Sequence, residues 1–449
     1  MKEKIVILGA GESGTGAAIL AKARGYDVFV SDSGPVKDKY REELSKHEIA
    51  FEEGGHSDEK ILGARLLIKS PGIPDKAPIM KKAASLNIPV CDEIEFAFRN
   101  TDAKIIAITG TNGKTTTTLL TYHLMKTAGF NVGLAGNVGF SMARQVATTK
   151  FDWYVLEVSS YQLDGTETFK PEIGILLNIT PDHLDRYEYN MQNYVNSKFQ
   201  LIENMTRQEQ FIYYVDDGVI TQEIKTRTVV PVQVPISLRG SGPVCYDGNK
   251  MVFNLKEKFS ISQSETTLRG PHNLINTMAA VSAAYLAGSG IEDIRKGLKT
   301  FVNAPHRLEF VGKIKGVDFI NDSKATNVDS VVYALGSYDK PLVWIAGGID
   351  KGNDYNLIKS QVKQKVRALI CLGKDNEKLK KAFGDVVPVI KETQSVKELV
   401  RMCLEVAEEG DVVLLSPACA SFDLFKNYED RGDQFRIAVK KLKEEVGNP

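Results

Sequence analysis

Short apolar runs alternate with helical stretches over the first hundred residues. Residues 5–8 are entirely apolar, and a glycine-rich turn, a helix of mostly small residues over 17–24 and a second apolar run over 27–31 follow. Buried strands of a parallel sheet read as continuous apolar runs, and the helices between them act as crossovers. The pattern therefore predicts an α/β domain with a parallel sheet.

The same rhythm recurs twice. A second set of strand-like runs lies at 104–109, 151–158 and 173–179, and a D-G-N turn predicts a hairpin within 246–255. A third set follows Pro305, at 317–320, 342–345, 368–372, 387–390 and 412–415. We predict three α/β domains: a Rossmann-like domain over 1–98, a central P-loop-type mononucleotide-binding domain over 99–304, and a Rossmann-like C-terminal domain over 305–449.

Composition narrows the class of protein. Lys and Arg together number 57 in the 449 residues, as do Asp and Glu, so the zero net charge favours neither a nucleic-acid nor a membrane partner. The five cysteines are scattered without a C-x-x-C pair, which argues against a disulfide framework or a zinc site. No apolar run approaches the roughly 18 residues of a membrane span, and the first predicted strand leaves no room for a signal peptide. We expect a cytoplasmic protein.

A glycine loop joins a strand to a helix at the start of the predicted central domain. It reads I-T-G-T-N-G-K-T-T over 108–116. Glycines let backbone N–H groups surround a phosphate, Lys114 can reach the β- and γ-phosphates, and the Thr115 hydroxyl can bind magnesium. The usual P-loop pattern has glycine where Ile108 stands, and the alternative is a turn that merely begins a helix. The candidate ATP-binding residues here are Gly110, Thr111, Asn112, Gly113, Lys114, Thr115 and Thr116.

A second glycine pattern follows the first strand. Gly9, Gly11 and Gly14 have the G-x-G-x-x-G spacing, and Asp32 lies near the end of the second strand, where a ribose-binding acid would lie. The pattern suggests a nucleotide ligand. By itself it is equally consistent with a tight turn.

Two polar side chains lie at the carboxyl ends of predicted central strands. Glu157 ends one run and His183 follows the next. Ligands of α/β proteins bind at this edge of the sheet, so the two side chains could converge on a magnesium ion held by ATP. A single Glu and a single His at strand ends are otherwise more often structural.

Taken together, these features resemble the Mur ligase family. The resemblance rests on G-T-N-G-K-T-T at 110–116, E-V-S-S-Y-Q-L at 157–163, N-I-T-P-D-H-L-D-R at 178–186, S-K at 197–198, H-N at 272–273, P-H-R-L-E at 305–309 and N-D-S-K-A-T-N at 321–327. The last stretches, S-P-A-C-A-S-F-D at 416–423 and K-N-Y-E-D-R-G at 426–432, resemble the members of the family that add D-glutamate.

The resemblance implies that each domain binds a different substrate. The first would bind the UDP part of UDP-N-acetylmuramoyl-L-alanine, the second ATP, and the third D-glutamate. Matching positions for the UDP precursor are Gly11, Ser13, Gly14, Thr15, Asp32, Ser33, Ser70, Gly72, Asn137, Ser159 and Gln162. Further ATP positions are Asn273, Arg307 and Asp322, and those for D-glutamate are Lys324, Thr326, Lys351, Ser421 and Tyr428.

The implied chemistry is amide formation through an acyl phosphate. Lys114, His183 and Lys198 would be catalytic. The family pattern implies two Mg²⁺ ions, held by Thr115, Glu157, His183 and Lys198, with Lys198 carrying a carbamate that turns its cation into an anion. We expect a monomer whose last domain closes about a hinge at 303–307 and excludes water from the acyl phosphate.

Three alternatives stay open. The nearest is another ligase of this kind, either L-alanine-adding or similar to folylpolyglutamate synthase, and the 416–432 stretch argues against both. A nucleotide-dependent switch would bind ATP without forming an amide, and would not need Glu157, His183 and Lys198 together with Lys114. A dehydrogenase would use the Gly9–Gly14 loop, but the chain offers no hydride-transfer residues elsewhere.

Overall fold

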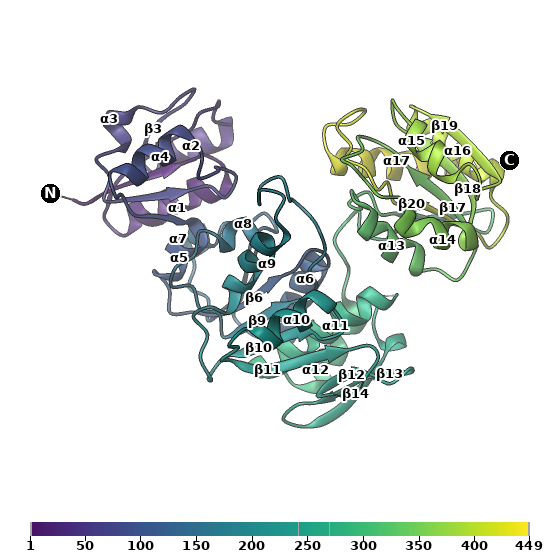
Figure 1. The fold of residues 1–449 in the computed structure, drawn as a ribbon, viewed down its shortest axis with the longest axis horizontal. Coiled ribbons are helices and arrows are strands. Elements are labelled where there is room, and N and C mark those ends of the chain that lie inside the picture. The colour runs from purple at the N-terminus through teal and green to yellow at the C-terminus, as the bar shows by residue number, and fades with distance from the viewer. Residues whose placement is uncertain (1, 241, 269, 448–449) are drawn as a thin grey trace. The chain divides into compact units, whose positions relative to one another are not determined.

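The computed structural model describes residues 2–240, 242–268 and 270–447, and contains three sheets with helices packed on them (Figure 1). These elements form two compact units. Met1–Thr267 and Ile275–Phe301 form the first, which contains two sheets, and Leu268–Leu274 and Val302–Pro449 form the second. The expected three-domain α/β class is confirmed, with one sheet in each domain.

The first sheet is parallel, in the order β3-β2-β1-β4-β5. The predicted strands at 5–8 and 27–31 are present as β1 and β2. The strands are β1 (Lys4–Leu8), β2 (Asp27–Ser31), β3 (Ala50–Glu52), β4 (Leu66–Lys69) and β5 (Val90–Asp92). The helices between them are α1 (Glu12–Ala23), α2 (Asp38–Lys46), α3 (Asp58–Ile61) and α4 (Pro78–Ser85), and α5 (Glu93–Phe98) follows β5.

The second sheet has nine strands, in the order β14-β13-β12-β11-β10-β9-β6-β8-β7. Its strands are β6 (Lys104–Thr109), β7 (Val132–Gly136), β8 (Trp153–Glu157), β9 (Ile173–Leu176), β10 (Gln210–Tyr214), β11 (Val232–Ser237), β12 (Val244–Tyr246), β13 (Lys250–Asn254) and β14 (Lys258–Ser262). The predicted hairpin is confirmed, because β12 and β13 pair antiparallel with Cys245 opposite Val252. Strand β9 ends three residues earlier than predicted, so the N-I-T-P-D-H stretch that follows is a loop.

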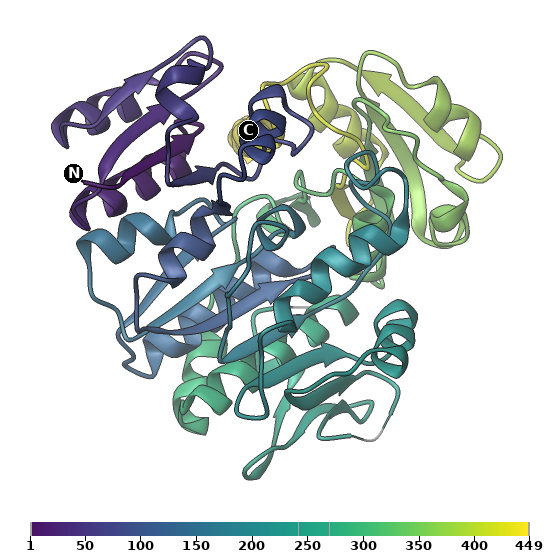
Figure 2. The same ribbon diagram turned by 60° about the vertical axis from the view of Figure 1, so that its left-hand side comes forward.

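Helices flank both faces of this central sheet (Figures 1 and 2). They are α6 (Lys114–Thr127), α7 (Met142–Thr148), α8 (Ser160–Leu163), α9 (Met191–Phe199), α10 (Gly218–Thr226), α11 (Pro271–Ala287) and α12 (Ile291–Thr300), with short 3₁₀ turns at Gln200–Ile202 and Gln263–Glu265.

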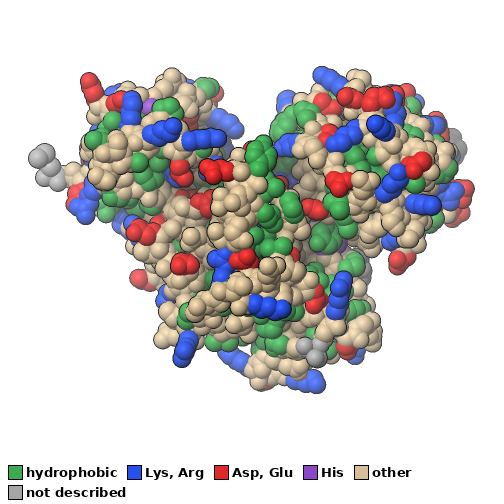
Figure 3. All heavy atoms as spheres, viewed as in Figure 1, with side chains coloured by type: hydrophobic (Ala, Val, Ile, Leu, Met, Phe, Trp, Pro, Cys, Tyr) green, Lys and Arg blue, Asp and Glu red, His purple; other side chains and the backbone are tan. Residues whose placement is uncertain are grey.

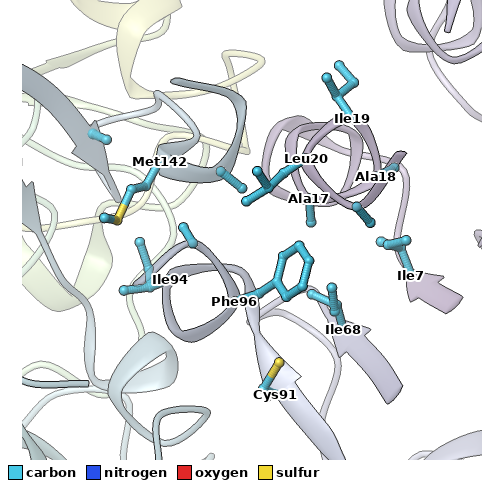
Figure 4. Packing of buried hydrophobic residues seen from close by; sticks show 14 of the residues in the cluster. Ile7, Ala17, Ala18, Ile19, Leu20, Ile68, Cys91, Ile94, Phe96 and Met142 are labelled. Atoms are coloured by element: carbon cyan, nitrogen blue, oxygen red, sulfur yellow. The ribbon is translucent and has the colours of Figure 1, made fainter. Parts of the chain in front are cut away.

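One apolar core joins the first two sheets (Figure 4). Leu20 of α1, Phe96 of α5 and Met142 of α7 are buried members of this core. The close approach of α1 and α7 requires small residues, because a Cβ on Gly16 would lie 2.0 Å from the Ser141 hydroxyl. The first domain and the central domain therefore pack as one unit.

The third sheet, in the second unit, has the order β15-β16-β20-β17-β18-β19 and is parallel except for the β15–β16 pair. The strands are β15 (Glu309–Ile314), β16 (Val317–Asn321), β17 (Leu342–Ala346), β18 (Val366–Leu372), β19 (Val389–Thr393) and β20 (Val412–Leu415). The helices are α13 (Val328–Gly336), α14 (Asn356–Lys365), α15 (Glu377–Phe383), α16 (Val396–Val406) and α17 (Tyr428–Gly447). Separate apolar cores cover the two faces, one around Trp344 and the other around Phe435.

Charged side chains of both signs are interspersed over the face drawn in Figure 3. None of the helices in the part of the chain that the structure describes combines the length and apolar character needed to cross a membrane.

Candidate active site

The predicted phosphate loop connects β6 to α6. Gly113 is the last residue before the helix and has φ +88°, a left-handed conformation that glycine adopts without strain. A Cβ at this position would also lie 2.4 Å from Asn276 Oδ1. The chain thus turns sharply into α6, whose first N–H groups are directed toward the loop as in anion-binding helix termini.

The loop is held by hydrogen bonds to the segment after β9. Asn112 N–H donates to Asn178 Oδ1 at 2.8 Å, and Asn178 Nδ2 donates back to Asn112 O at 3.0 Å. The Thr111 hydroxyl donates to Thr180 O at 3.0 Å. These contacts fix the loop before a phosphate enters it.

Two predicted catalytic lysines meet at one backbone carbonyl of this loop. Lys114 Nζ donates to Gly110 O and to Thr111 O, both at 2.8 Å. Lys198 Nζ, from α9, donates to the same Gly110 O at 2.9 Å. Lys198 follows Gly110 by 88 positions in the chain, so the fold brings two distant segments together at the loop.

Lys198 is almost fully buried, with 1% of its surface exposed. Burial lowers the pKa of its ammonium well below the usual value, and the positive charge of Lys114 lowers the pKa further. Its Nζ also lies 4.6 Å from the centre of the Tyr194 ring, and within the described chain it forms no ion pair. Burial therefore favours the neutral, nucleophilic form of this amine more than it is favoured in an exposed lysine.

Glu157 ends β8 and is 2% exposed. One carboxylate oxygen, Oε1, accepts a hydrogen bond from Asn137 Nδ2 at 2.8 Å. The other, Oε2, is buried and has no hydrogen-bond partner among the described residues. An unsatisfied buried carboxylate oxygen is costly, and carboxylate oxygen is the ligand that Mg²⁺ prefers. The residues at this strand end therefore fit a magnesium ion.

His183 lies in the loop after β9 and is largely exposed. Its backbone has φ +52°, its Nε2 is 3.6 Å from Asp182 Oδ2, and its ring centre is 5.2 Å from that of Tyr161. Across the described residues it hydrogen-bonds neither Glu157 nor Lys198, and no group of three or more His, Cys, Asp or Glu is gathered to hold a metal. The shared metal role of Glu157 and His183 stays a prediction.

A cavity of about 570 Å³ opens beside the glycine loop of the first domain. Several predicted UDP-precursor positions line it, namely Gly11, Asp32, Ser33, Ser70 and Gly72, whereas Ser13, Gly14 and Thr15 lie in α1 outside the lining. Sequence reasoning missed His56, Asp58 and Lys82, which also line it beside an apolar wall that includes Ile73 and Ile79. In the sequence, His56 and Asp58 stand out only because they follow strand β3, and Lys82 only because it lies within helix α4.

The glycine spacing has a steric reason. A Cβ on Gly14 would lie 1.8 Å from the carbonyl oxygen of Gly9, so the first turn of α1 packs directly on the loop. Asp32 fixes the same loop from the other side, because its carboxylate accepts from Ala10 N–H at 2.7 Å and Gly34 N–H at 2.8 Å. Each oxygen keeps a lone pair for a ligand hydroxyl.

Three other predicted precursor residues make contacts within the central domain. Asn137 orients Glu157, as described above. Ser159 and Gln162 form a capping box at the start of α8, in which Gln162 N–H donates to the Ser159 hydroxyl at 3.3 Å and Ser159 N–H donates to Gln162 Oε1 at 3.0 Å. The structure thus gives both residues a local structural role.

The remaining predicted site residues belong to the second unit. Lys324 Nζ lies 3.7 Å from the centre of the Tyr428 ring, Ser421 is buried, and Lys351 is exposed. Thr326 and Arg307 are half-buried, and Asn273 is buried in the first turn of α11.

Asp322 is buried at the end of β16. It accepts hydrogen bonds from the Ser416 hydroxyl at 3.0 Å and from Leu308 N–H at 3.2 Å. Burial raises the pKa of its carboxyl to about 7, against the opposing effect of the Ser416 hydrogen bond. Nearby lies the fully buried Arg431, which sequence reasoning did not single out. It donates to Ser323 O at 2.9 Å and to Cys419 O at 3.2 Å, and so links the segment after β16 to the segment after β20.

Comparison with known proteins identifies the family. The Mur ligase middle domain matches residues 108–284, the Mur ligase glutamate ligase domain matches 306–419, and the MurD N-terminal domain matches 4–79. A UDP-N-acetylmuramoylalanine–D-glutamate ligase from Cytophaga hutchinsonii is 54% identical over 448 residues, which cover 98% of this chain and all of that protein. A protein of the same name from Bacteroides fragilis is 50% identical over 443 residues, with 98% and 100% covered. The chain belongs to the Mur ligase family.

Solved structures show the same fold in other members and relatives of the Mur ligases. A pseudomurein peptide ligase type C from Methanothermus fervidus superposes with a TM-score of 0.65 at 18% identity, covering 98% of this chain and 100% of that one. MurF ligase from Thermotoga maritima, solved with ADP, gives a TM-score of 0.62 at 14% identity, with 94% and 97% covered. The resemblance inferred from motifs is confirmed, and this Mur ligase is an ATP-dependent, amide-forming enzyme.

Proposed function

We propose that this Mur ligase joins D-glutamate to UDP-N-acetylmuramoyl-L-alanine with conversion of ATP to ADP and phosphate, a step in building peptidoglycan precursors. The observation that carries the proposal is the match at 54% identity across 98% of the chain to a protein named for that reaction. The match includes the third domain, where the identity of the incoming amino acid would be decided.

The chemistry follows from the weakness of a carboxylate as an electrophile. Its oxygen is a poor leaving group, so the γ-phosphoryl group of ATP is first transferred to it, giving ADP and an acyl phosphate. The amine of D-glutamate then attacks the acyl carbon, a C–N bond forms, inorganic phosphate leaves and the amine loses a proton. Catalysis of the first step is mainly neutralisation of charge on the transferring group.

We assign binding of the ATP phosphates to Lys114 and the rest of the loop 110–116. Glu157 Oε2 and the Thr115 hydroxyl would hold Mg²⁺ there, and His183 and Lys198 would hold a second ion. Bound magnesium supplies positive charge to the phosphate oxygens. Closure of the site would exclude water from the acyl phosphate.

Lys198 is proposed to carry a carbamate. Its buried amine contacts the Gly110 carbonyl and has the positive charge of Lys114 nearby, which favours the neutral form. The neutral nitrogen would attack the carbon of carbon dioxide, forming an N–C bond and releasing a proton. The product is an anion beside a cationic lysine, and a ligand suited to a hard metal.

The carbamate predicts chemical rescue. Lys198→Ala should lower turnover roughly a hundredfold or more, as expected when a charge-stabilising group is removed, and added acetate or propionate should restore part of it. The exposed Lys150, replaced by alanine, is the matched control and should leave turnover unchanged. Full activity of Lys198→Ala without added acid would contradict the modification.

Recognition of D-glutamate is assigned to Lys324, Thr326, Lys351, Ser421 and Tyr428, and ATP contacts outside the loop to Asn273, Arg307 and Asp322. A dicarboxylate requires cations and hydroxyl donors, which the first group supplies. Contacts to the precursor are assigned to the cavity residues of the first domain together with Ser13, Gly14, Thr15, Asn137, Ser159 and Gln162. We place the domain boundaries at 98/99 and 304/305 and the protein in the cytoplasm, as a monomer.

The deciding experiment is phosphate release with ATP and UDP-N-acetylmuramoyl-L-alanine, comparing D-glutamate, L-glutamate, L-alanine and L-lysine. We expect release with D-glutamate and little with the others. Release with UDP-N-acetylmuramate and L-alanine would indicate the L-alanine-adding reaction, and release with a folate and L-glutamate the folylpolyglutamate reaction. Lys114→Ala should abolish release in every case.

A further inference from the structure

A network of three hydrogen-bonded residues lies beside the cavity of the first domain. Ser31 ends β2 and is fully buried; its hydroxyl donates to Glu52 Oε1 at 2.8 Å and lies 2.7 Å from His56 Nδ1. His56 lines the cavity, whereas Glu52 and Ser31 do not. The network therefore links a half-buried carboxylate to a ring that lines the cavity.

The network determines which nitrogen of neutral His56 carries the hydrogen. A serine hydroxyl has one hydrogen, and in this site it is directed to the charged Glu52 oxygen at 2.8 Å, not to Gly55 O at 3.4 Å. The short contact with His56 Nδ1 must then use a ring N–H donating to the Ser31 oxygen. Nδ1 is the protonated nitrogen, and Nε2 keeps a lone pair.

Glu52 is held in its charged form, which keeps this assignment fixed. Burial alone would raise the pKa of the carboxyl, but hydrogen bonds from Ser57 and Ser31 and the nearby Lys60 outweigh it and lower the pKa to about 2. Glu52 Oε1 accepts from Ser57 N–H at 2.8 Å, and Oε2 from Lys60 Nζ at 3.3 Å. An acceptor of this strength holds the Ser31 hydrogen.

The other nitrogen of the His56 ring, Nε2, is available to a ligand in the cavity. Among the described residues Nε2 makes no hydrogen bond, and the ring lines the same space as Asp32 and the apolar residues Ile73 and Ile79. A pyrimidine base has an apolar face and a polar edge, which suits an apolar wall next to a fixed acceptor.

We propose that His56 Nε2 accepts a hydrogen bond from the N3–H of the uracil base and so makes the site specific for uridine nucleotides. This inference rests on the proposed function, which supplies a UDP-linked substrate. Cytosine presents a lone pair at N3, so it would face the His56 lone pair and be rejected. A ribose hydroxyl can both donate and accept, so a fixed acceptor distinguishes nothing there, whereas the imide N–H can only donate.

Nucleotide binding to the full chain tests the proposal. Isothermal titration calorimetry would compare UDP with CDP, N3-methyl-UDP and 2′-deoxy-UDP. We expect wild type to bind UDP about 10- to 100-fold more tightly than CDP or N3-methyl-UDP, because either analogue leaves the His56 acceptor unpaired. His56→Ala should reduce both ratios to about threefold or less.

Two further variants separate recognition from folding. Ser31→Ala keeps the His56 ring but removes the oxygen that fixes Nδ1–H, and should lower the UDP preference by several-fold. His47→Ala replaces a histidine of the same domain outside the cavity and should retain the wild-type ratios. Nitrogen NMR of ¹⁵N-histidine protein, with the His56 signals assigned from His56→Ala, should show Nδ1 protonated and Nε2 unprotonated.

Three results would overturn the proposal. The first is a protonated Nε2 in neutral His56, and the second is equal binding of UDP and N3-methyl-UDP to wild type. The third is a loss of affinity in His56→Ala that occurs with UDP but not with 2′-deoxy-UDP, which would place the ribose 2′-hydroxyl at this ring. Ligase activity is measured separately by phosphate release. Activity with D-glutamate but no UDP preference would reject only the His56 assignment, and UDP preference without activity would reject only the proposed reaction.

Discussion

At the scale of single residues, the site consists of polar groups that come from distant segments of the central domain. Lys114 and Lys198 donate to the same Gly110 carbonyl, and Glu157 has one buried oxygen without a hydrogen-bond partner among the described residues. A buried carboxylate oxygen of this kind is poorly compensated by the protein alone. We expect phosphate, carbon dioxide and magnesium to bind at these groups.

Replacing Glu157 by glutamine should separate metal binding from folding. The amide is cheaper to bury than a carboxylate with an unpaired oxygen, so we expect the metal-free variant to be as stable as wild type or more stable by about 1 kcal/mol. Activity should fall roughly a hundredfold or more, since the ligand for Mg²⁺ is lost. Thermal denaturation with and without Mg²⁺ and ADP, alongside phosphate release, measures both.

The control for Glu157→Gln is Glu203→Gln, at an exposed carboxylate of the same domain, which should change neither quantity. If Glu157→Gln retained the stabilisation by Mg²⁺ and ADP seen for wild type, the metal assignment of Glu157 would be wrong.

At the scale of elements, close contacts between a loop and a helix or between two helices require particular residues. Gly14 in α1 approaches the Gly9 carbonyl, while Gly11, three residues earlier, has open space around its missing Cβ. Of these two glycines, only Gly14 is required because a Cβ at its position would clash with the backbone.

The pair Gly14→Ala and Gly11→Ala makes that difference measurable. Alanine at 14 would force its Cβ into the Gly9 carbonyl, so we expect a loss of about 2 kcal/mol or more in the free energy of unfolding. Alanine at 11, where φ is −82°, should cost about 1 kcal/mol or less. Chemical denaturation of both variants provides the comparison, and equal losses would contradict the steric account.

A second element-scale feature is the buried acid at the start of α5. Glu93 Oε1 accepts from the Ser141 hydroxyl and from Ala143 N–H of α7, both at 2.6 Å, so it joins the two helices. Burial raises the pKa of its carboxyl from 4.5 to about 7, and the neighbouring Glu12 adds to the rise. The native state therefore holds this proton more tightly than the unfolded chain does.

That difference gives a signed pH prediction. Between pH 4.5 and 7 the native state binds more protons at Glu93 than the unfolded state, so its contribution to stability falls as pH rises and is lost above about pH 7. Glu93→Gln keeps both acceptor contacts without a charge. Relative to wild type it should gain stability with rising pH through this window, by a few kcal/mol in total.

Urea denaturation at several pH values measures the Glu93 effect as the difference between variant and wild type. The exposed Glu42, replaced by glutamine, should give a difference that stays flat with pH. A flat difference for Glu93→Gln as well would refute the shift.

Much of the element order could be predicted from sequence, for a physical reason. Strands such as β1, β6 and β20 are buried on both faces, so they appear as uninterrupted apolar runs, and glycine marks the turns between them. Strand β9 was predicted too long because Leu177 and Ile179 are buried although they lie beyond its last residue, Leu176. Burial and strand pairing leave the same sequence signal.

The candidate site was predictable only in part. Lys114 and Glu157 lie where local patterns put them, one in a glycine loop and one at a strand end. The meeting of Lys114 with Lys198 and the network of Ser31, Glu52 and His56 depend on contacts between segments far apart in the chain. Periodicity carries no information about such pairs, and only the family resemblance pointed to Lys198.

At the scale of the whole molecule, the proposed reaction needs groups from both compact units. The phosphate loop with Lys114 belongs to the first unit, whereas Lys324 and Asp322 belong to the second. The acyl phosphate and the attacking amine must come within bonding distance, and water must be kept out while they do. We therefore expect substrates to favour a closer arrangement of the units, with the chain bending near residues 303–307. His306 in this segment and Leu308 just after it have positive φ.

Small-angle X-ray scattering tests this closure. With a non-hydrolysable ATP analogue, Mg²⁺ and UDP-N-acetylmuramoyl-L-alanine present together, the radius of gyration should fall relative to the free protein, since binding energy is available only when both units contact the ligands. Lys114→Ala, which weakens the phosphate grip in the first unit alone, should need more of the ATP analogue to give the same decrease. Pro substitution at Asn303, which restricts the backbone where bending is expected, should reduce the decrease without changing nucleotide binding to the first unit. An identical scattering profile for wild type with and without the full set of ligands would mean that the units do not close, and that the second-unit residues assigned to the reaction act from where they already lie or not at all.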